Sequence, residues 1–139
     1  MANTLQGAKS VLALPPQSIN GTDTNGTAID TAGYSYASIF FLYGASTVDM
    51  EHLEIQECET SGGSYTAISG SAMTVPTSTD DNKVWQWGIN LGGTRMRYLK
   101  IRVDPGAAAT LVGALAILTK GNIDCDTDTE RGVAQSLFI

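Results

Sequence analysis

The apolar stretch YASIFFLYGAS, residues 36–46, constrains the fold of this chain more than any other feature. It is far shorter than the roughly 20 apolar residues that a membrane-spanning helix needs. A strand with one face in water alternates apolar and polar residues, whereas residues 36–43 are apolar on both faces. Residues 109–118 form a second run of this kind. We therefore expect both segments at the centre of a sheet, with other groups packed on each side.

The remaining segments predict strands separated by turns. Residues 51–58 and 83–91 alternate between apolar and polar positions, and residues 95–103 do so again. Gly-rich or Pro-containing turns follow these segments at 60–64, 92–94 and 104–107. The leucines of 109–120 also fit helical spacing, but the run is short and follows a tight turn, so a buried strand is favoured. The pattern predicts an all-β, antiparallel β-sandwich or jelly-roll-like single domain.

We expect extended arms on both sides of this domain. The prediction is an N-terminal arm over 1–20, a β-sandwich over 21–120 and a C-terminal arm over 121–139. Pro15-Pro16 should end a short apolar segment, because proline cannot join the centre of a ladder. The chain finishes on apolar residues, which should dock on its own sandwich or on a neighbouring subunit. The predicted interface residues are Val11, Leu12, Leu14, Leu137, Phe138 and Ile139.

Charge and hydropathy limit the partners that this chain can have. The net charge is −6 and the estimated pI is about 4.5. Only 16% of residues are charged, and so small a charged surface suggests that the chain assembles with other subunits. Four cations, Arg95, Arg97, Lys100 and Arg102, cluster in one alternating strand, where they should divide between its faces. We therefore predict no nucleic-acid partner. No export signal or membrane-length segment is visible, so we predict no membrane partner and synthesis in a cytoplasm.

No arrangement of residues indicates catalysis. The single histidine, His52, lies on the polar phase of its strand without a nucleophile motif nearby, and a solvated role is favoured. The glycine pairs lack the residues of a phosphate-binding loop. Cys58 and Cys125 are expected to be thiols, a disulfide between them being the less favoured alternative. We predict that the protein is not an enzyme and needs no cofactor.

Three further patterns each have two interpretations. Asp124, Asp126 and Asp128 alternate like the start of a calcium loop, but the required glycine and final glutamate are missing. An EF-hand is thereby excluded; a solvated acidic linker is favoured over a looser calcium site, and no metal is predicted. Trp85 and Trp87 share a phase with apolar residues, which favours the core over a sugar-stacking platform. The Asn-Gly pairs at 20–21 and 25–26 match a glycosylation pattern, but turn chemistry is favoured.

Several short motifs, in this order along the chain, resemble a known group of proteins. The chain resembles head decoration, or cement, proteins of tailed bacteriophages, including those of short-tailed cyanophages. The resemblance covers roughly residues 30–119 and excludes both arms. It is carried by LEIQE (53–57), SGGSY (61–65), DN (81–82) and RYLK (97–100).

The resemblance implies a β-sandwich that assembles as a homotrimer on the capsid exterior and bridges subunits of the major capsid protein. It implies no catalytic residue and no cofactor. The expected function is stabilisation of the capsid against the pressure of packaged DNA, after assembly in the host cytoplasm. A sugar- or receptor-binding β-domain of a phage tail fibre or adhesin is the alternative, motivated by Trp85 and Trp87.

Overall fold

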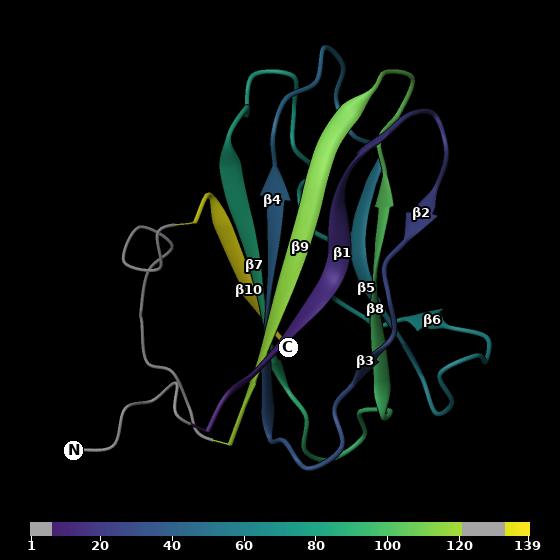
Figure 1. The fold of residues 1–139 in the computed structure, drawn as a ribbon, viewed down its shortest axis with the longest axis vertical. Coiled ribbons are helices and arrows are strands. Elements are labelled where there is room, and N and C mark those ends of the chain that lie inside the picture. Colours follow the sequence, from purple (N-terminus) through teal and green to yellow (C-terminus); the bar gives the residue numbers. More distant parts are fainter. Residues whose placement is uncertain (1–6, 121–132) are drawn as a thin grey trace.

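The computed structural model describes residues 7–120 and 133–139, and it contains two β-sheets packed face to face (Figure 1). Within these residues there is no helix, and hence no helix that could span a membrane. The predicted all-β sandwich is confirmed. The first sheet has the order β1 (Lys9–Ile19), β9 (Thr110–Thr119), β4 (Tyr36–Tyr43), β7 (Lys83–Asn90), β10 (Gln135–Phe138). The second has the order β2 (Thr24–Asn25), β8 (Tyr98–Asp104), β5 (His52–Cys58), β6 (Thr66–Ala67), and β3 (Ile29–Asp30) also pairs with β8.

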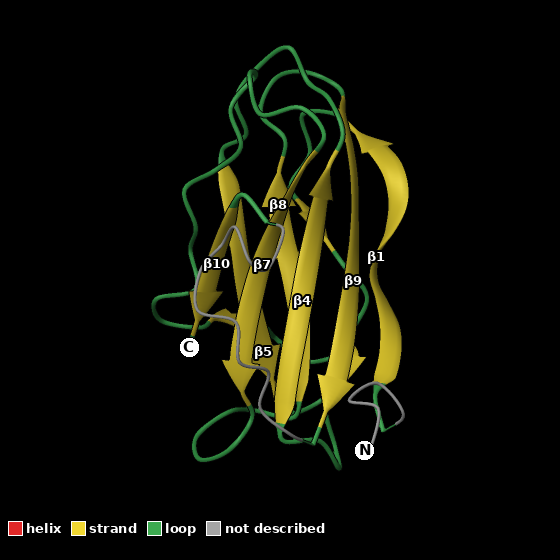
Figure 2. Cartoon of the chain, turned by 90° about the vertical axis from the view of Figure 1, so that its left-hand side faces the viewer, coloured by secondary structure: helices red, strands yellow, loops and turns green. Residues whose placement is uncertain are grey.

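The two most apolar segments lie in the middle of the first sheet, as predicted. β4 pairs antiparallel with β9 on one side and with β7 on the other, over its whole length in both cases. The 109–120 segment is therefore a strand and not a helix. Figure 2 shows the five strands of this sheet side by side, with β5 and β8 of the second sheet behind them. One face of β4 and β9 packs on the second sheet, and the other face points away from the sandwich.

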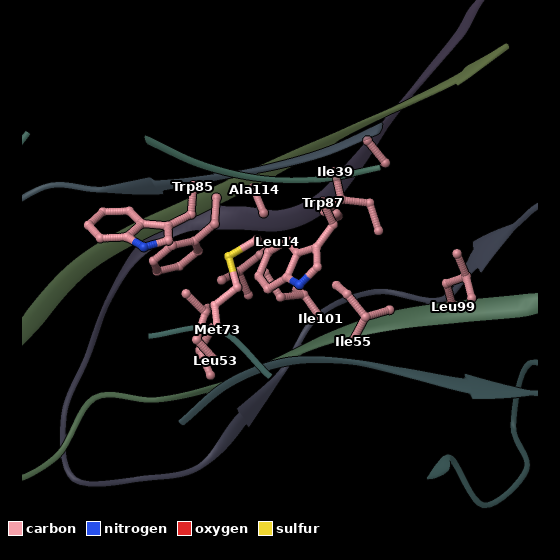
Figure 3. Close-up of a cluster of buried hydrophobic side chains, with 14 of the residues drawn as sticks. Leu14, Ile39, Leu53, Ile55, Met73, Trp85, Trp87, Leu99, Ile101 and Ala114 are labelled. Atoms are coloured by element: carbon pink, nitrogen blue, oxygen red, sulfur yellow. The ribbon is translucent and has the colours of Figure 1, made fainter. Parts of the chain in front are cut away.

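The core fills the space between the sheets and is built around Trp87, which is completely buried (Figure 3). Its indole Nε1–H donates a hydrogen bond to the carbonyl oxygen of Ser71, at 2.8 Å. The buried Ser71 hydroxyl in turn donates to the carbonyl of Ile55 on β5, at 3.0 Å. A chain of two hydrogen bonds thus joins the first sheet to the second through the apolar interior. Other core side chains include Leu14, Ile39, Phe41, Leu53, Ile55, Trp85, Leu99 and Ile101.

The two prolines do not end the first strand, contrary to the sequence-based expectation. β1 continues past Pro15-Pro16 as far as Ile19 and pairs with β9 on both sides of the prolines. The pairing is irregular there, with register shifts between Leu12 and Leu14 and between Leu14 and Gln17. The prolines are tolerated because β1 is an edge strand, whose outward-facing N–H groups have no neighbouring strand to bond.

A short segment closes the side of the sandwich between β1 and β8. Gly26 donates its N–H to the carbonyl of Ile101 in the second sheet, and Thr27 donates its N–H to the carbonyl of Ala13 in the first. At the Asn20-Gly21 pair the chain bends, with φ +62° at the glycine, but it joins strands of different sheets and so forms no hairpin. The Asn25-Gly26 pair does not form a turn, so that prediction is wrong. Gly26 is there because β1 leaves no room for a side chain.

The opposite edge of the first sheet is formed by β10. It runs parallel to β7, with Gln135 beside Trp85 and Phe138 beside Gly88. The pairing is extended by Ile139, whose N–H bonds to the carbonyl of Gly88 and whose carbonyl accepts the N–H of Asn90. In the structure, residues 135–139 therefore dock on their own sandwich, one of the two locations that the sequence left open.

Candidate interaction surface

The outer face of the first sheet exposes large apolar side chains. Because successive strand residues point to opposite faces, burial of Ile39 and Phe41 in the core directs Phe40 and Leu42 outward. Four leucines are exposed by more than a third of their surface, and all four lie on this face: Leu12 (51%), Leu42 (47%), Leu111 (56%) and Leu115 (37%). We call this surface, formed by β1, β9, β4 and β7, the outer face of the first sheet.

The strand register gathers these side chains into a continuous row. Leu12 on β1 is directly opposite Leu115 on β9, and Leu115 is directly opposite Phe40 on β4. Opposite residues in a ladder have Cβ atoms about 5 Å apart, so their side chains touch. Neither β4 nor β9 contains a charged residue, and β1 and β7 carry only Lys9 and Lys83, at their first positions. The row of side chains is therefore apolar and without charge, whereas Ser38 on β4 and Gln86 on β7, which share its outward phase, are polar and buried.

A shallow groove of about 340 Å³ lies at one end of this face. Its walls include Pro16, Leu42, Val84 and Leu111. Gly113 is opposite Leu42 in the register and has no side chain, so it leaves a depression between the flanking leucines. An apolar groove of this kind can receive a large side chain from another molecule.

Covering this face would stabilise an assembly appreciably. The exposed parts of the four leucines amount to about two whole leucine side chains. Burying a leucine side chain is worth about 1.5–3 kcal/mol, so these residues alone offer roughly 3–6 kcal/mol before the cost of association. Contiguous exposed apolar surface on a folded protein commonly marks a site of interaction with another molecule.

The outer face of the second sheet has the opposite character. Arg102 on β8 bonds to Glu54 on β5 (Nη1–Oε1, 2.9 Å) and to Asp23 (Nη2–Oδ2, 2.8 Å). Arg97 binds both carboxylate oxygens of Asp30, each at 2.9 Å. Lys100, also on this face, lies over the ring of Tyr65. Arg95 precedes β8 and lies 3.6 Å from Glu57, which is buried on the core phase of β5. The two outer faces of the sandwich thus differ sharply in polarity.

Because of the ion pairs on the second sheet, we expect the free energy of unfolding to decrease in acid. The hydrogen bonds from Arg97 and from the N–H of Ala32 lower the pKa of Asp30 from 3.8 to about 2. Because this pKa is lower in the folded state, the carboxylate stabilises the protein above about pH 4, and that contribution disappears as the pH falls towards 2. The free energy of unfolding, measured between pH 5 and pH 2, should therefore fall less steeply in Asp30→Asn. An unchanged slope in the variant would contradict the prediction.

The predicted interface residues have different locations in the structure. Leu12 is exposed on the outer face, whereas Leu14 is buried in the core and Val11 packs partly against it. Leu137 and Ile139 are partly buried against the core of their own chain, and Phe138 pairs with Gly88 through its backbone. Three of the exposed leucines were not among the predicted interface residues: Leu42, Leu111 and Leu115. The sequence feature that indicates them is the absence of alternating polar residues in β4 and β9. It predicts apolar side chains on both faces of these strands, so that each face must pack against something.

The other candidate residues show no convergent site. His52 is exposed on β5, and Trp85 and Trp87 are buried, so these indoles cannot stack a sugar. The tail-fibre alternative thereby loses the observation that motivated it. Cys58 is a buried thiol; Cys125 and the acidic residues Asp124, Asp126 and Asp128 lie outside the described residues. Among residues 7–120 and 133–139, no group of three or more His, Cys, Asp or Glu side chains could hold a metal ion.

No protein-family model matches this chain, and no curated protein matches it.

Proposed function

We propose that this chain is a structural protein of a tailed bacteriophage, a decoration or cement protein on the outside of the capsid. In this role it forms a homotrimer that bridges subunits of the major capsid protein, as the resemblance in residues 30–119 implies. The observation that carries the proposal is the group of exposed leucines on the outer face of the first sheet, because a protein that works by binding other proteins needs an apolar surface of this kind. In this role the protein binds other proteins and carries out no chemical step.

The proposed mechanism is mechanical. Packaged DNA pushes the shell outward, and the contacts between capsid subunits resist their separation. A trimer that touches several subunits at once adds contacts that are lost only when the shell opens. Because its binding sites are linked, the second and third contacts form at a high effective concentration, and modest individual affinities combine into a strong attachment. The protein would be made in the host cytoplasm and would function on the virion exterior.

The contrast between the two outer faces supports this role. A decoration protein needs one surface for protein contacts and another that faces solvent. The outer face of the first sheet suits the contacts, while the ion pairs around Arg97 and Arg102 suit a solvated exterior. The net charge of −6 also disfavours attraction to the DNA inside the shell.

Binding to capsids tests the proposal directly. Heads would be purified from a tailed phage that carries this gene, after deletion of the gene. We expect the added protein to sediment with these heads, to saturate at a fixed number of copies, and to raise by several degrees the temperature at which they release DNA. Heads of an unrelated tailed phage are the control and should bind none. Failure to bind the cognate heads at micromolar concentration would overturn the proposed function.

A further inference from the structure

We propose that Asn20 is a site of spontaneous deamidation, whereas the fold protects Asn25, which stands in the same Asn-Gly-Thr sequence. In the first step, the main-chain nitrogen of the following glycine forms a bond to the side-chain amide carbon of asparagine. The bond from that carbon to Nδ2 breaks, ammonia leaves with the proton of the glycine nitrogen, and a succinimide ring remains. Water then opens the ring at either carbonyl and gives aspartate or isoaspartate. The reaction involves no partner and goes beyond the proposed function.

Two properties of the following residue control the first step. A side chain on that residue crowds the approach of its nitrogen, and glycine has none. Its N–H must also be free, because a nitrogen whose hydrogen is bonded to a carbonyl cannot readily lose the proton and turn towards the asparagine. The other asparagines of the described residues, Asn82 and Asn90, precede a lysine and a leucine and fail the first condition. Both Asn-Gly pairs satisfy it, so the second condition distinguishes them.

The N–H of Gly21 meets the second condition. Gly21 lies in the loop between β1 and β2, and within residues 7–120 and 133–139 its N–H makes no hydrogen bond. Asn20, Gly21 and Thr22 are all exposed. A Cβ atom added to Gly21 would meet, beyond its chain neighbours, only the carbonyl oxygen of Gly106, at 3.9 Å. The loop therefore has both a free nitrogen and the space in which the ring can close.

The N–H of Gly26 does not meet this condition. It donates to the carbonyl of Ile101 at 2.8 Å, and the next N–H along the chain, that of Thr27, donates to the carbonyl of Ala13 at 2.9 Å. Gly26 is buried, and a Cβ atom there would overlap the carbonyl oxygen of Ala13. The segment must leave both sheets before the ring can form at Asn25. Reaction at Asn25 is thus limited to the small fraction of molecules in which this segment is locally open.

Modification at the two positions would affect the fold differently. Isoaspartate adds one atom to the main chain. At residue 20 that atom lies in an exposed loop, between the last pair of β1 with β9 and the first pair of β2 with β8, so the loop can absorb it. At residue 25 it would displace the N–H groups that close the side of the sandwich. Protein modified at Asn20 should therefore stay folded and accumulate, its net charge changed from −6 to −7 by the one new carboxylate.

Timed incubation of the purified full chain at mildly alkaline pH tests the inference, since loss of the N–H proton is favoured there. Fragment-ion mass spectrometry of digests would locate each conversion of amide to acid. In the folded protein, Asn20 should convert roughly tenfold or more faster than Asn25. The matched control is the same chain unfolded in urea, where neither N–H is held. There the two asparagines, each followed by Gly-Thr, should convert at similar rates.

Two variants confirm the assignment. Asn20→Gln keeps the amide but lengthens the side chain, which disfavours ring closure, so the more acidic form of the protein should no longer appear on ion exchange. Asn25→Gln should leave that form unchanged. The acidic form of the wild-type protein, once isolated, should have the melting temperature of the unmodified protein.

The contrary outcomes are distinct. Equal conversion of Asn20 and Asn25 in the folded chain, or faster conversion at Asn25, would overturn the inference. A folded Asn20→Gln variant that still forms the acidic species at the wild-type rate would do the same. A lower melting temperature of the acidic form would overturn the claim that the loop absorbs the change. Failure to bind phage heads would defeat the proposed function and leave this inference standing, because no step of the reaction involves a partner.

Discussion

Replacement of Trp87 by alanine is expected to lower the free energy of unfolding by about 3–5 kcal/mol, the largest effect of any single substitution considered for this chain. The side chain is completely buried between the sheets, so its removal leaves a cavity surrounded by core residues of both layers. The loss of the indole N–H also leaves the carbonyl of Ser71 without its partner in a buried position. Urea denaturation followed by circular dichroism would measure the change.

A matched variant divides this effect into packing and hydrogen bonding. Trp87→Phe retains much of the aromatic volume and removes the donor to Ser71, so it should cost about 1–3 kcal/mol and less than the alanine variant. If Trp87→Ala lost less than about 1 kcal/mol, the indole would not be a central part of the core, and the packing described around it would be wrong.

The second large effect is expected at Gly26, which should not tolerate even an alanine. A Cβ atom at this position would overlap the carbonyl oxygen of Ala13 and approach Cγ2 of Ile101 to 2.7 Å. Relief of the overlap requires β1 to move away from β8, which would stretch the bonds that Gly26 and Thr27 make to the two sheets. We expect Gly26→Ala to cost about 2–4 kcal/mol, combining overpacking with weakened hydrogen bonds.

Gly62→Ala provides the control for Gly26→Ala. The substitution is the same, but a Cβ atom at Gly62 would meet nothing within 4 Å, and its φ is not in the left-handed region. Its effect should be within about 0.5 kcal/mol of zero. Equal melting temperatures for the two variants would show that the 24–27 segment does not hold the sheets together.

Much of this fold is predictable from sequence because its strands are marked by period and by turns. The alternation in residues 51–58 and 83–91 predicts β5 and β7, and the turn at Pro105-Gly106 has the expected positive φ of +72° at the glycine. The central position of β4 and β9 follows from their continuous apolarity. Parallel addition of β10 to β7 is not predictable in this way, because a four-residue strand has too few positions to establish a period.

The surface is harder to predict than the fold, and β1 shows why. Leu12 and Leu14 are two residues apart, so a regular strand would place both on one face. The register shift between them inserts an extra residue, and as a result Leu12 points outward while Ala13 and Leu14 are both buried. Nothing in the local sequence marks that irregularity. For β4 and β9, sequence shows that both faces are apolar but not which face meets the second sheet, since that depends on the pairing of distant strands.

The prolines of β1 affect the way in which this protein can assemble. An unprotected strand at the margin of a sheet can act as a template for the next molecule, and repeated addition of that kind leads to open-ended fibrils. Pro15 and Pro16 offer no N–H to an incoming strand, and the irregular pairing around them distorts the margin further. Addition of a strand at the β1 margin is thereby hindered, which leaves β10 as the margin of this sheet open to such pairing.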